Sequence, residues 1–162
     1  MEELFSKLQA ERVDIVQANG DLRLSLYNSA SHPAKLPPGA AGIAFFNCIG
    51  EEFGGLVLQS SKQGASYTSN LSLTFGKTSG YAIRAAISEA DTQRKYGYTV
   101  FQAGTERMFI GKDAGAIVVR LMDSRGKVRI SVELDASGES CLTILDADGN
   151  ASNRLNSLKW EG

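Results

Sequence analysis

Residues 47–55, with the sequence NCIGEEFGG, gather the side chains best able to do chemistry. Cys48 offers a thiol, Glu51 and Glu52 offer carboxylates, and Asn47 offers an amide, beside glycines that let a ligand approach the backbone closely. Paired carboxylates facing a cleft could perform acid–base catalysis on a glycan or another small molecule. The competing interpretation, which we favour, is a bulged hairpin with a buried cysteine and two solvated glutamates.

Tyr96 and Tyr98, in the stretch KYGYTVF, form a second candidate binding site. Residues two apart on a strand share a face, so the two rings could stack on a sugar or a flat ligand. Aromatic residues at this spacing more often pack on the face of a sheet, because they favour strands.

Other catalytic templates fail. His32 is the single histidine, which excludes a multi-histidine metal site within one chain. The stretch FGKTSG resembles the end of a phosphate-binding loop, but Leu71 stands where its first glycine is required. We therefore predict no catalytic residue, metal or cofactor, and a non-catalytic binding or scaffold module for a small-molecule or glycan ligand. A carboxylate-dependent enzyme with its site near residues 47–55 is the alternative.

Composition narrows the possible partners. The 162 residues carry 17 basic and 18 acidic side chains and a net charge of -1, which gives no electrostatic footprint for nucleic acid or an anionic membrane. The N-terminus lacks the features of a secretory signal, and Cys48 and Cys141 are isolated as reduced thiols would be. We expect a cytoplasmic protein with an N-terminal segment at residues 1–12 and one domain at 13–162. A chain this long can bury about 68–70% of its unfolded surface, so we expect it to fold on its own core.

Glycines recur with the period of hairpins in the second half of the chain, at 104, 115, 126, 138 and 149. Three of these turns read DSRG, DASG and DADG, in which Asp can bond its own backbone and Gly supplies a positive φ. The calcium alternative fails, because placing Gly149 at position 6 of an EF-hand loop puts Ile144 and Leu155 at ligand positions. The pattern therefore predicts tight turns.

The stretches between these turns predict about 12 short strands in an up-and-down antiparallel meander. Residues 128–134 alternate apolar and polar side chains, which indicates one buried face. Residues 81–90 fit either a strand or a helix, and we choose the strand. The meander suits a propeller-like unit of three blades, which would need two chains to complete a ring, or a barrel, prism-like bundle or sandwich.

The ends of the meander predict self-association. Exposed edge strands must be paired, covered or charged, and symmetric dimers are the commonest solution. Leu4, Phe5 and Leu8 suggest a short N-terminal helix or an oligomer contact. We therefore expect a homo-oligomer.

From Arg12 onward the chain resembles a family of small bacterial all-β proteins with repeated Asp-x-x-Gly hairpins, for which no function is known. The stretches that carry the resemblance are RVDIVQANGDLRLSLYN, AGIAFFNCIGEEFGGLVL, LSLTF and FIGKD. The chain departs from the family pattern at Cys48, where an acidic residue is usual. The resemblance implies an all-β fold and no particular function.

Overall fold

The computed structural model describes residues 7–31, 38–76, 80–91 and 93–156. Within these ranges all regular structure is β-strand. The strands are β1 Arg12–Val16, β2 Leu22–Asn28, β3 Ala40–Phe46, β4 Glu52–Gln63, β5 Ser66–Phe75, β6 Ile83–Ala90, β7 Gln93–Gln102, β8 Thr105–Asp113, β9 Ala116–Met122, β10 Val128–Leu134, β11 Ser140–Leu145 and β12 Ala151–Asn156.

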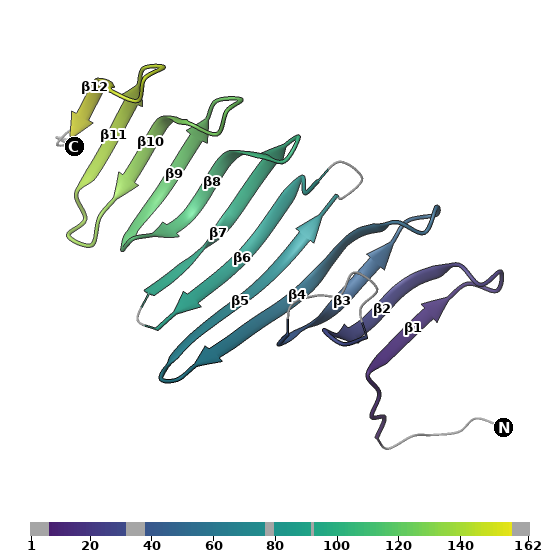
Figure 1. Cartoon of the computed structure of the whole chain (residues 1–162). Helices are drawn as coiled ribbons and strands as arrows, with labels where there is room; N and C mark the ends of the chain where they lie inside the picture. The colour runs from purple at the N-terminus through teal and green to yellow at the C-terminus, as the bar shows by residue number, and fades with distance from the viewer. Residues whose placement is uncertain (1–6, 32–37, 77–79, 92, 157–162) are drawn as a thin grey trace, which may run out of the picture.

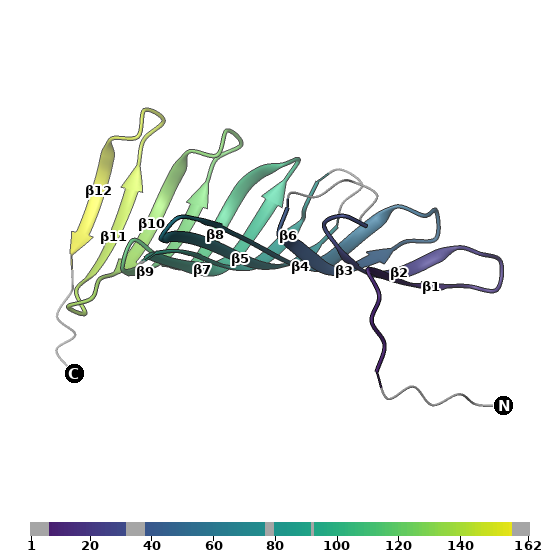
Figure 2. The same ribbon diagram turned by 60° about the horizontal axis from the view of Figure 1, so that its bottom comes forward.

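The twelve strands form one antiparallel sheet in the order of the sequence (Figure 1). The predicted all-β meander is confirmed, and residues 83–90 form strand β6 rather than a helix. The propeller, barrel, prism and sandwich interpretations are wrong. Each strand pairs with its neighbours in sequence without a break into blades, and β1 and β12 stay at opposite edges, so the sheet does not close. Figure 2 shows it as a single curved layer.

Five of the hairpin turns share one hydrogen-bond pattern, at residues 17–21, 47–51, 123–127, 135–139 and 146–150. In each, the first residue donates its N–H to the carbonyl of the fifth and accepts a bond from the N–H of the fourth, a glycine with φ between 77° and 93°. Asp123, Asp135 and Asp146 also accept, through Oδ1, the N–H groups two and four residues on, at 2.9–3.1 Å. The acidic turns are therefore backbone reversals, as predicted.

The turns on either side of β8 are tighter. Ala103 and Gly104 have φ values of 49° and 78°, and Ala114 and Gly115 have φ values of 49° and 89°. Two consecutive positive φ values define the two-residue turn that matches the right-handed twist of paired strands. These turns join β7 to β8 and β8 to β9.

The expectation of a self-contained core is wrong. In the described residues only five apolar side chains are buried, Tyr27, Ala40, Ala44, Phe109 and Val118. The chain exposes 11583 Å² of surface, whereas a compact protein of its mass exposes about 7,800 Å². A single layer cannot bury either face against another, so the surface that a second layer would cover stays open.

The described residues before β1, 7–11, add no second layer. Leu8 is 70% exposed and lies outside any helix, so the described part of the predicted N-terminal helix is absent. Leu4 and Phe5 lie outside the described residues.

Candidate interaction surface

One face of the sheet, here called the apolar face, carries apolar side chains in rows that cross it from edge to edge. Strand pairing aligns twelve residues, one from each strand, into a central row without a polar member. Partners joined by register point to the same face, so these side chains lie side by side. The central row is Val13, Leu26, Ile43, Leu56, Leu73, Ala85, Tyr98, Ile110, Val119, Val132, Leu142 and Leu155.

A second row on the apolar face is almost as apolar. It holds glycine or apolar residues on eleven strands and ends in Asn153 on β12. Its members are Ile15, Leu24, Phe45, Gly54, Phe75, Ile83, Val100, Met108, Leu121, Ile130, Ile144 and Asn153. Neither row contains a charge.

The apolar face is exposed. Leu56, Ile110 and Val132 of the central row keep 37%, 40% and 44% of their surface accessible. Monomeric proteins rarely expose a contiguous apolar patch larger than a few hundred Å², and larger patches mark binding surfaces. Two aligned rows across twelve strands exceed that size.

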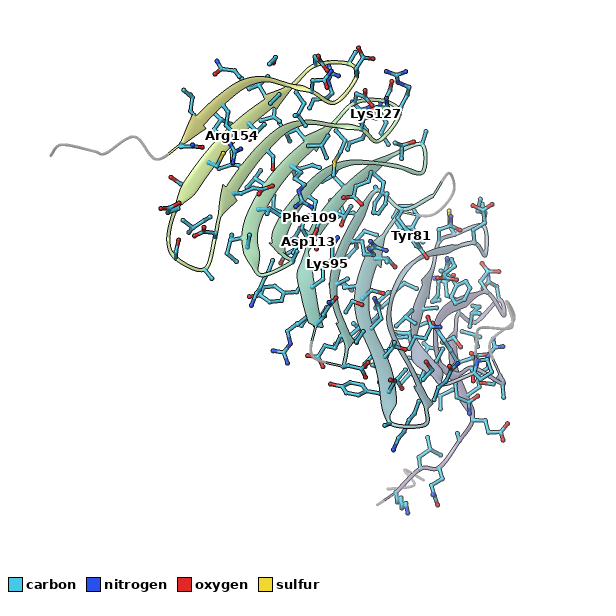
Figure 3. All side chains as sticks on the ribbon, turned by 60° about the vertical axis from the view of Figure 1, so that its left-hand side comes forward. Tyr81, Lys95, Phe109, Asp113, Lys127 and Arg154 are labelled. Atoms are coloured by element: carbon cyan, nitrogen blue, oxygen red, sulfur yellow. The ribbon has the colours of Figure 1, made fainter. Side chains whose placement is uncertain are left out.

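The opposite face, here called the polar face, is the better buried one. Ser25, Thr74, Thr99 and Ser131 point to it and are at most 6% exposed. Long side chains on neighbouring strands cover them, and Figure 3 shows Lys95, Phe109 and Asp113 close together there. A soluble sheet with one covered face ordinarily buries its apolar side, so this chain has the reverse of the expected burial.

Asp113 joins three strands of the polar face. Its carboxylate accepts hydrogen bonds from Arg120 at 2.7 Å and from Lys95 at 3.3 Å. Partial burial acts to raise the pKa of Asp113, but these two hydrogen bonds and charges outweigh it and hold the pKa below 3.8. Arg120 also lies 3.7 Å from Glu133. The network fixes the side chains that cover the polar face.

Aromatic rings contribute to the same cover. The guanidinium carbon of Arg84 lies 5.4 Å from the centre of the Phe101 ring, which contacts Tyr81 edge to face at 6.3 Å. Lys95 Nζ lies 4.7 Å from the centre of the Phe109 ring. These cation–π contacts place cationic groups over rings that would otherwise face water.

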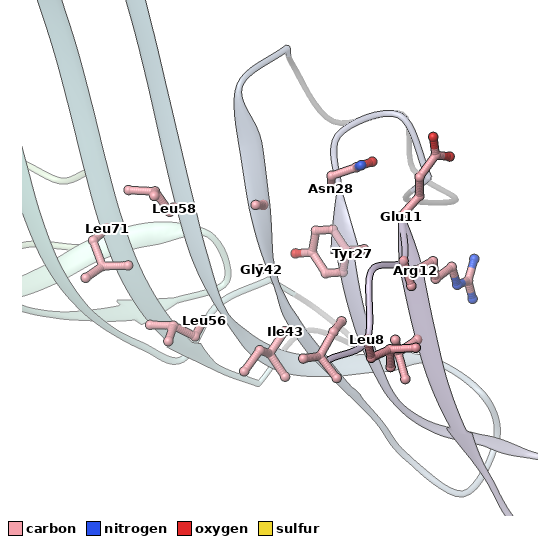
Figure 4. A pocket seen from close by; sticks show the side chains of 14 residues that line it. Leu8, Glu11, Arg12, Tyr27, Asn28, Gly42, Ile43, Leu56, Leu58 and Leu71 are labelled. Carbon is pink, nitrogen blue, oxygen red and sulfur yellow. The ribbon is translucent and has the colours of Figure 1, made fainter. Parts of the chain in front are cut away.

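The apolar face has two hollows. One, of about 320 Å³, lies over β4 to β7, with Ala85 and Gly97 between larger side chains that include Leu73, Ile87 and Tyr98. The other, of about 550 Å³, lies over β1 to β5 beside the segment that holds Leu8 (Figure 4). Both are lined mostly by aliphatic side chains.

The candidate site at residues 47–55 occupies the turn between β3 and β4. Oδ1 of Asn47 accepts the N–H groups of Ile49 at 3.1 Å and Glu51 at 3.0 Å, as the aspartates do in the other turns. Cys48 and Glu51 are exposed at the tip, so the expectation of a buried cysteine is wrong. Glu52 begins β4. Burial of the Tyr27 side chain is the main cause that raises the pKa of Tyr27, and the negative charge of Glu52 raises this pKa further.

Gly54 and Gly55 are required because the neighbouring strands approach the backbone of β4 closely at these positions. A Cβ on Gly54 would lie 2.5 Å from the carbonyl oxygen of Thr74, and one on Gly55 would lie 2.4 Å from that of Ile43. Backbone packing therefore excludes any larger residue at either position.

Tyr96 and Tyr98 lie elsewhere, on β7 and on the apolar face. The hollow that they line contains none of the residues 47–52. The structure therefore does not bring the two predicted sets of site residues together. His32 lies outside the described residues.

The rows of the apolar face were not predicted from the sequence. The alternation seen in residues 128–134 was their signal, but the rows appear only when the register of every hairpin is known.

Comparison with known proteins does not assign this chain to a family. Neither the models of protein families nor the curated proteins contain a match to this chain. Across the described residues, no helix could span a membrane and no cluster of three metal-ligating side chains occurs.

Proposed function

We propose that this protein is a non-catalytic scaffold module that works as a homo-oligomer, in which a second copy of the chain covers the apolar face. The observation that carries the proposal is the uninterrupted central row of apolar side chains, each of which is exposed or half-buried. Burial of apolar surface stabilises an association by roughly 25 cal/mol per Å² before entropic costs.

The dimensions of the apolar face fit a permanent interface. Twelve strands about 4.8 Å apart span about 53 Å, and two to three rows of side chains span about 20 Å. Each copy then contributes on the order of 1,000 Å², or about 2,000 Å² for a pair, which reaches the range of obligate homodimers. A weak, transient contact would not need so wide a surface.

A second copy is favoured over a different partner by the chemistry of the face. Its two main rows hold no charge, so they offer nothing for a charged partner to recognise. A symmetric contact supplies to each copy the same uncharged surface that the other presents.

This proposal gives Tyr96 and Tyr98 a role in the interface instead of stacking on a ligand. Scaffolding is also favoured over the carboxylate-dependent enzyme near residues 47–55. The amide of Asn47 is used by its turn, and Gly54 and Gly55 are needed by strand packing.

The test compares charge on the two faces. Ile110→Glu places a carboxylate in the central row, whereas Ser88→Glu places one at an exposed position of the polar face. We expect light scattering to report an oligomer for the wild type and for Ser88→Glu, and a smaller species for Ile110→Glu. If the two variants had equal masses, the apolar face would not be the surface through which the copies associate.

A further inference from the structure

Resting on the proposed self-association, the geometry points to one arrangement of the two copies. We infer that two sheets stack face to face about a two-fold axis that runs parallel to the strands, between β6 and β7. In this arrangement Tyr98 of each copy enters the hollow at Ala85 of the other, and Arg94 of each copy faces Glu89 of the other.

The position of the axis follows from the number of strands. An axis between stacked sheets and parallel to the strands exchanges residues that lie at the same height on either side of it. With the axis between β6 and β7, the middle of the sheet, β6 stacks on β7 of the partner and β1 on β12. If the axis ran parallel to the strands at any other position, each copy would keep uncovered strands at one edge of its apolar face.

The centre of the face carries a projection beside a hollow. Tyr98 is 61% exposed, more than any other aromatic side chain in the described residues. Its direct partner across the strands is Ala85, which has the smallest side chain of the central row. Because Ala85 and Tyr98 lie at the same height on either side of the axis, the two-fold operation puts each Tyr98 over the other copy's Ala85.

The hollow is shaped to receive such a ring. It has a volume of about 320 Å³ and is lined by Leu56, Leu73 and Ile87 around Ala85. Large aromatic side chains that fill apolar pockets near the centre of an interface carry much of its binding energy.

Two charged side chains at the rim of the apolar rows become complementary when the two-fold axis relates the copies. Glu89 on β6 and Arg94 on β7 form another directly opposed pair, two rows from Ala85 and Tyr98, and their side chains lie 2.5 Å apart. The axis places Arg94 of one copy opposite Glu89 of the other, at the rim of the apolar rows. Stacked sheets lie about 10 Å apart, a gap that these two long side chains can bridge.

The test uses two single variants. Two copies of the same variant should repel each other, whereas copies of the two different variants should attract each other. Glu89→Arg makes both positions positive, and Arg94→Glu makes both negative, so each homodimer faces like charges across the axis. In a mixture, every facing pair is opposite in sign. Each variant also places like charges on neighbouring strands within its own chain, and mixing does not alter this repulsion. Any recovery of dimerisation in the mixture therefore reports contacts between chains.

We expect each single variant to dimerise about tenfold more weakly than the wild type, and the mixture to recover most of that loss. Tyr98→Ala should weaken dimerisation at least tenfold, on the order of a hot-spot residue, while Ser88→Ala, at an exposed position on the polar face of β6, should leave it unchanged. Circular dichroism checks that every variant keeps the strand content of the wild type.

The outcomes separate the two proposals. A wild-type dimer whose charge variants neither weaken it nor recover on mixing overturns the axis and leaves the homo-oligomer standing. A trimer or larger assembly also overturns the two-fold arrangement. A wild-type monomer overturns both.

Discussion

Gly97 and Gly111 lie directly opposite each other on β7 and β8, and no side chain fits between them. A Cβ on Gly111 would lie 2.0 Å from the carbonyl oxygen of Tyr96 and 2.6 Å from Cα of Gly97. The Phe109 ring, 4% exposed, covers the same place, since a Cβ on Gly97 would lie 2.9 Å from it. The glycine pair lets the Phe109 ring approach the backbone closely on the polar face.

Gly111→Ala should therefore destabilise the protein strongly, by about 3 kcal/mol, because the contacts are with backbone that cannot move away cheaply. Gly115→Ala is the matched control. It has nothing within 4 Å of the added methyl group and bears only the strain of its φ of 89°, about 1 kcal/mol. Urea denaturation at one protein concentration compares them, and a Gly111→Ala protein as stable as Gly115→Ala would show that the two strands lie farther apart than described.

Asn47 should behave as a turn residue. Asn47→Ala removes the acceptor for two backbone N–H groups and should cost about 1 kcal/mol. Asn47→Asp installs the residue that three other turns use and should be close to neutral. Thermal denaturation measures both, with Cys48→Ser at the exposed tip as a neutral control. If Asn47→Asp is as damaging as Asn47→Ala, the amide has a role that the turn does not explain.

Asp113 should make stability depend on pH in the acid range. Its pKa is lowered in the folded state, so its contribution is present above the unfolded value of about 3.8 and is lost as pH falls through the folded pKa. Asp113→Asn should be less stable than the wild type by on the order of 1 kcal/mol at pH 7. The difference should shrink below pH 3.8, as denaturation curves at several pH values would show. A gap that stays constant down to pH 2.5 would mean that the charge of Asp113 contributes nothing.

Cys141 should react faster than an ordinary thiol. A hydrogen bond with Thr143 and another from Arg154, at 3.3 Å, hold the pKa of Cys141 below its usual range. In a Cys48→Ser background, Arg154→Met should slow alkylation of Cys141 at pH 7 about threefold, because less thiolate is present. The pH at which the rate reaches half its maximum should move upward. A profile that does not move would rule out an influence of Arg154 on the thiol.

The fold was predictable to the level of the meander, and no further. Gly126, Gly138 and Gly149 mark turns whose geometry depends on a few adjacent residues, and residues 128–134 alternate as a strand exposed on one side must. Whether the meander closes depends on contacts between β1 and β12, which lie far apart in the sequence and carry no pairing signal. The same lack of long-range information led to the wrong expectation of a core.

The candidate site was less predictable, for a reason that Asn47 illustrates. A cluster of amide, thiol and carboxylate groups looks the same in sequence whether it surrounds a ligand or caps a turn. The central row was hidden for the opposite reason. Ala85, Tyr98 and Ile110 look unremarkable one strand at a time, and only the register of successive hairpins places them in one line across the sheet.

Sedimentation equilibrium of the wild-type protein tests the central claim most directly, since it reports mass without reference to shape. If a second copy covers the apolar face, the mass at micromolar concentration should be twice the 17.3 kDa of the chain and should not fall on moderate dilution. A stable, well-folded species of 17.3 kDa across that range would contradict the account, because the apolar face would then lie open to water.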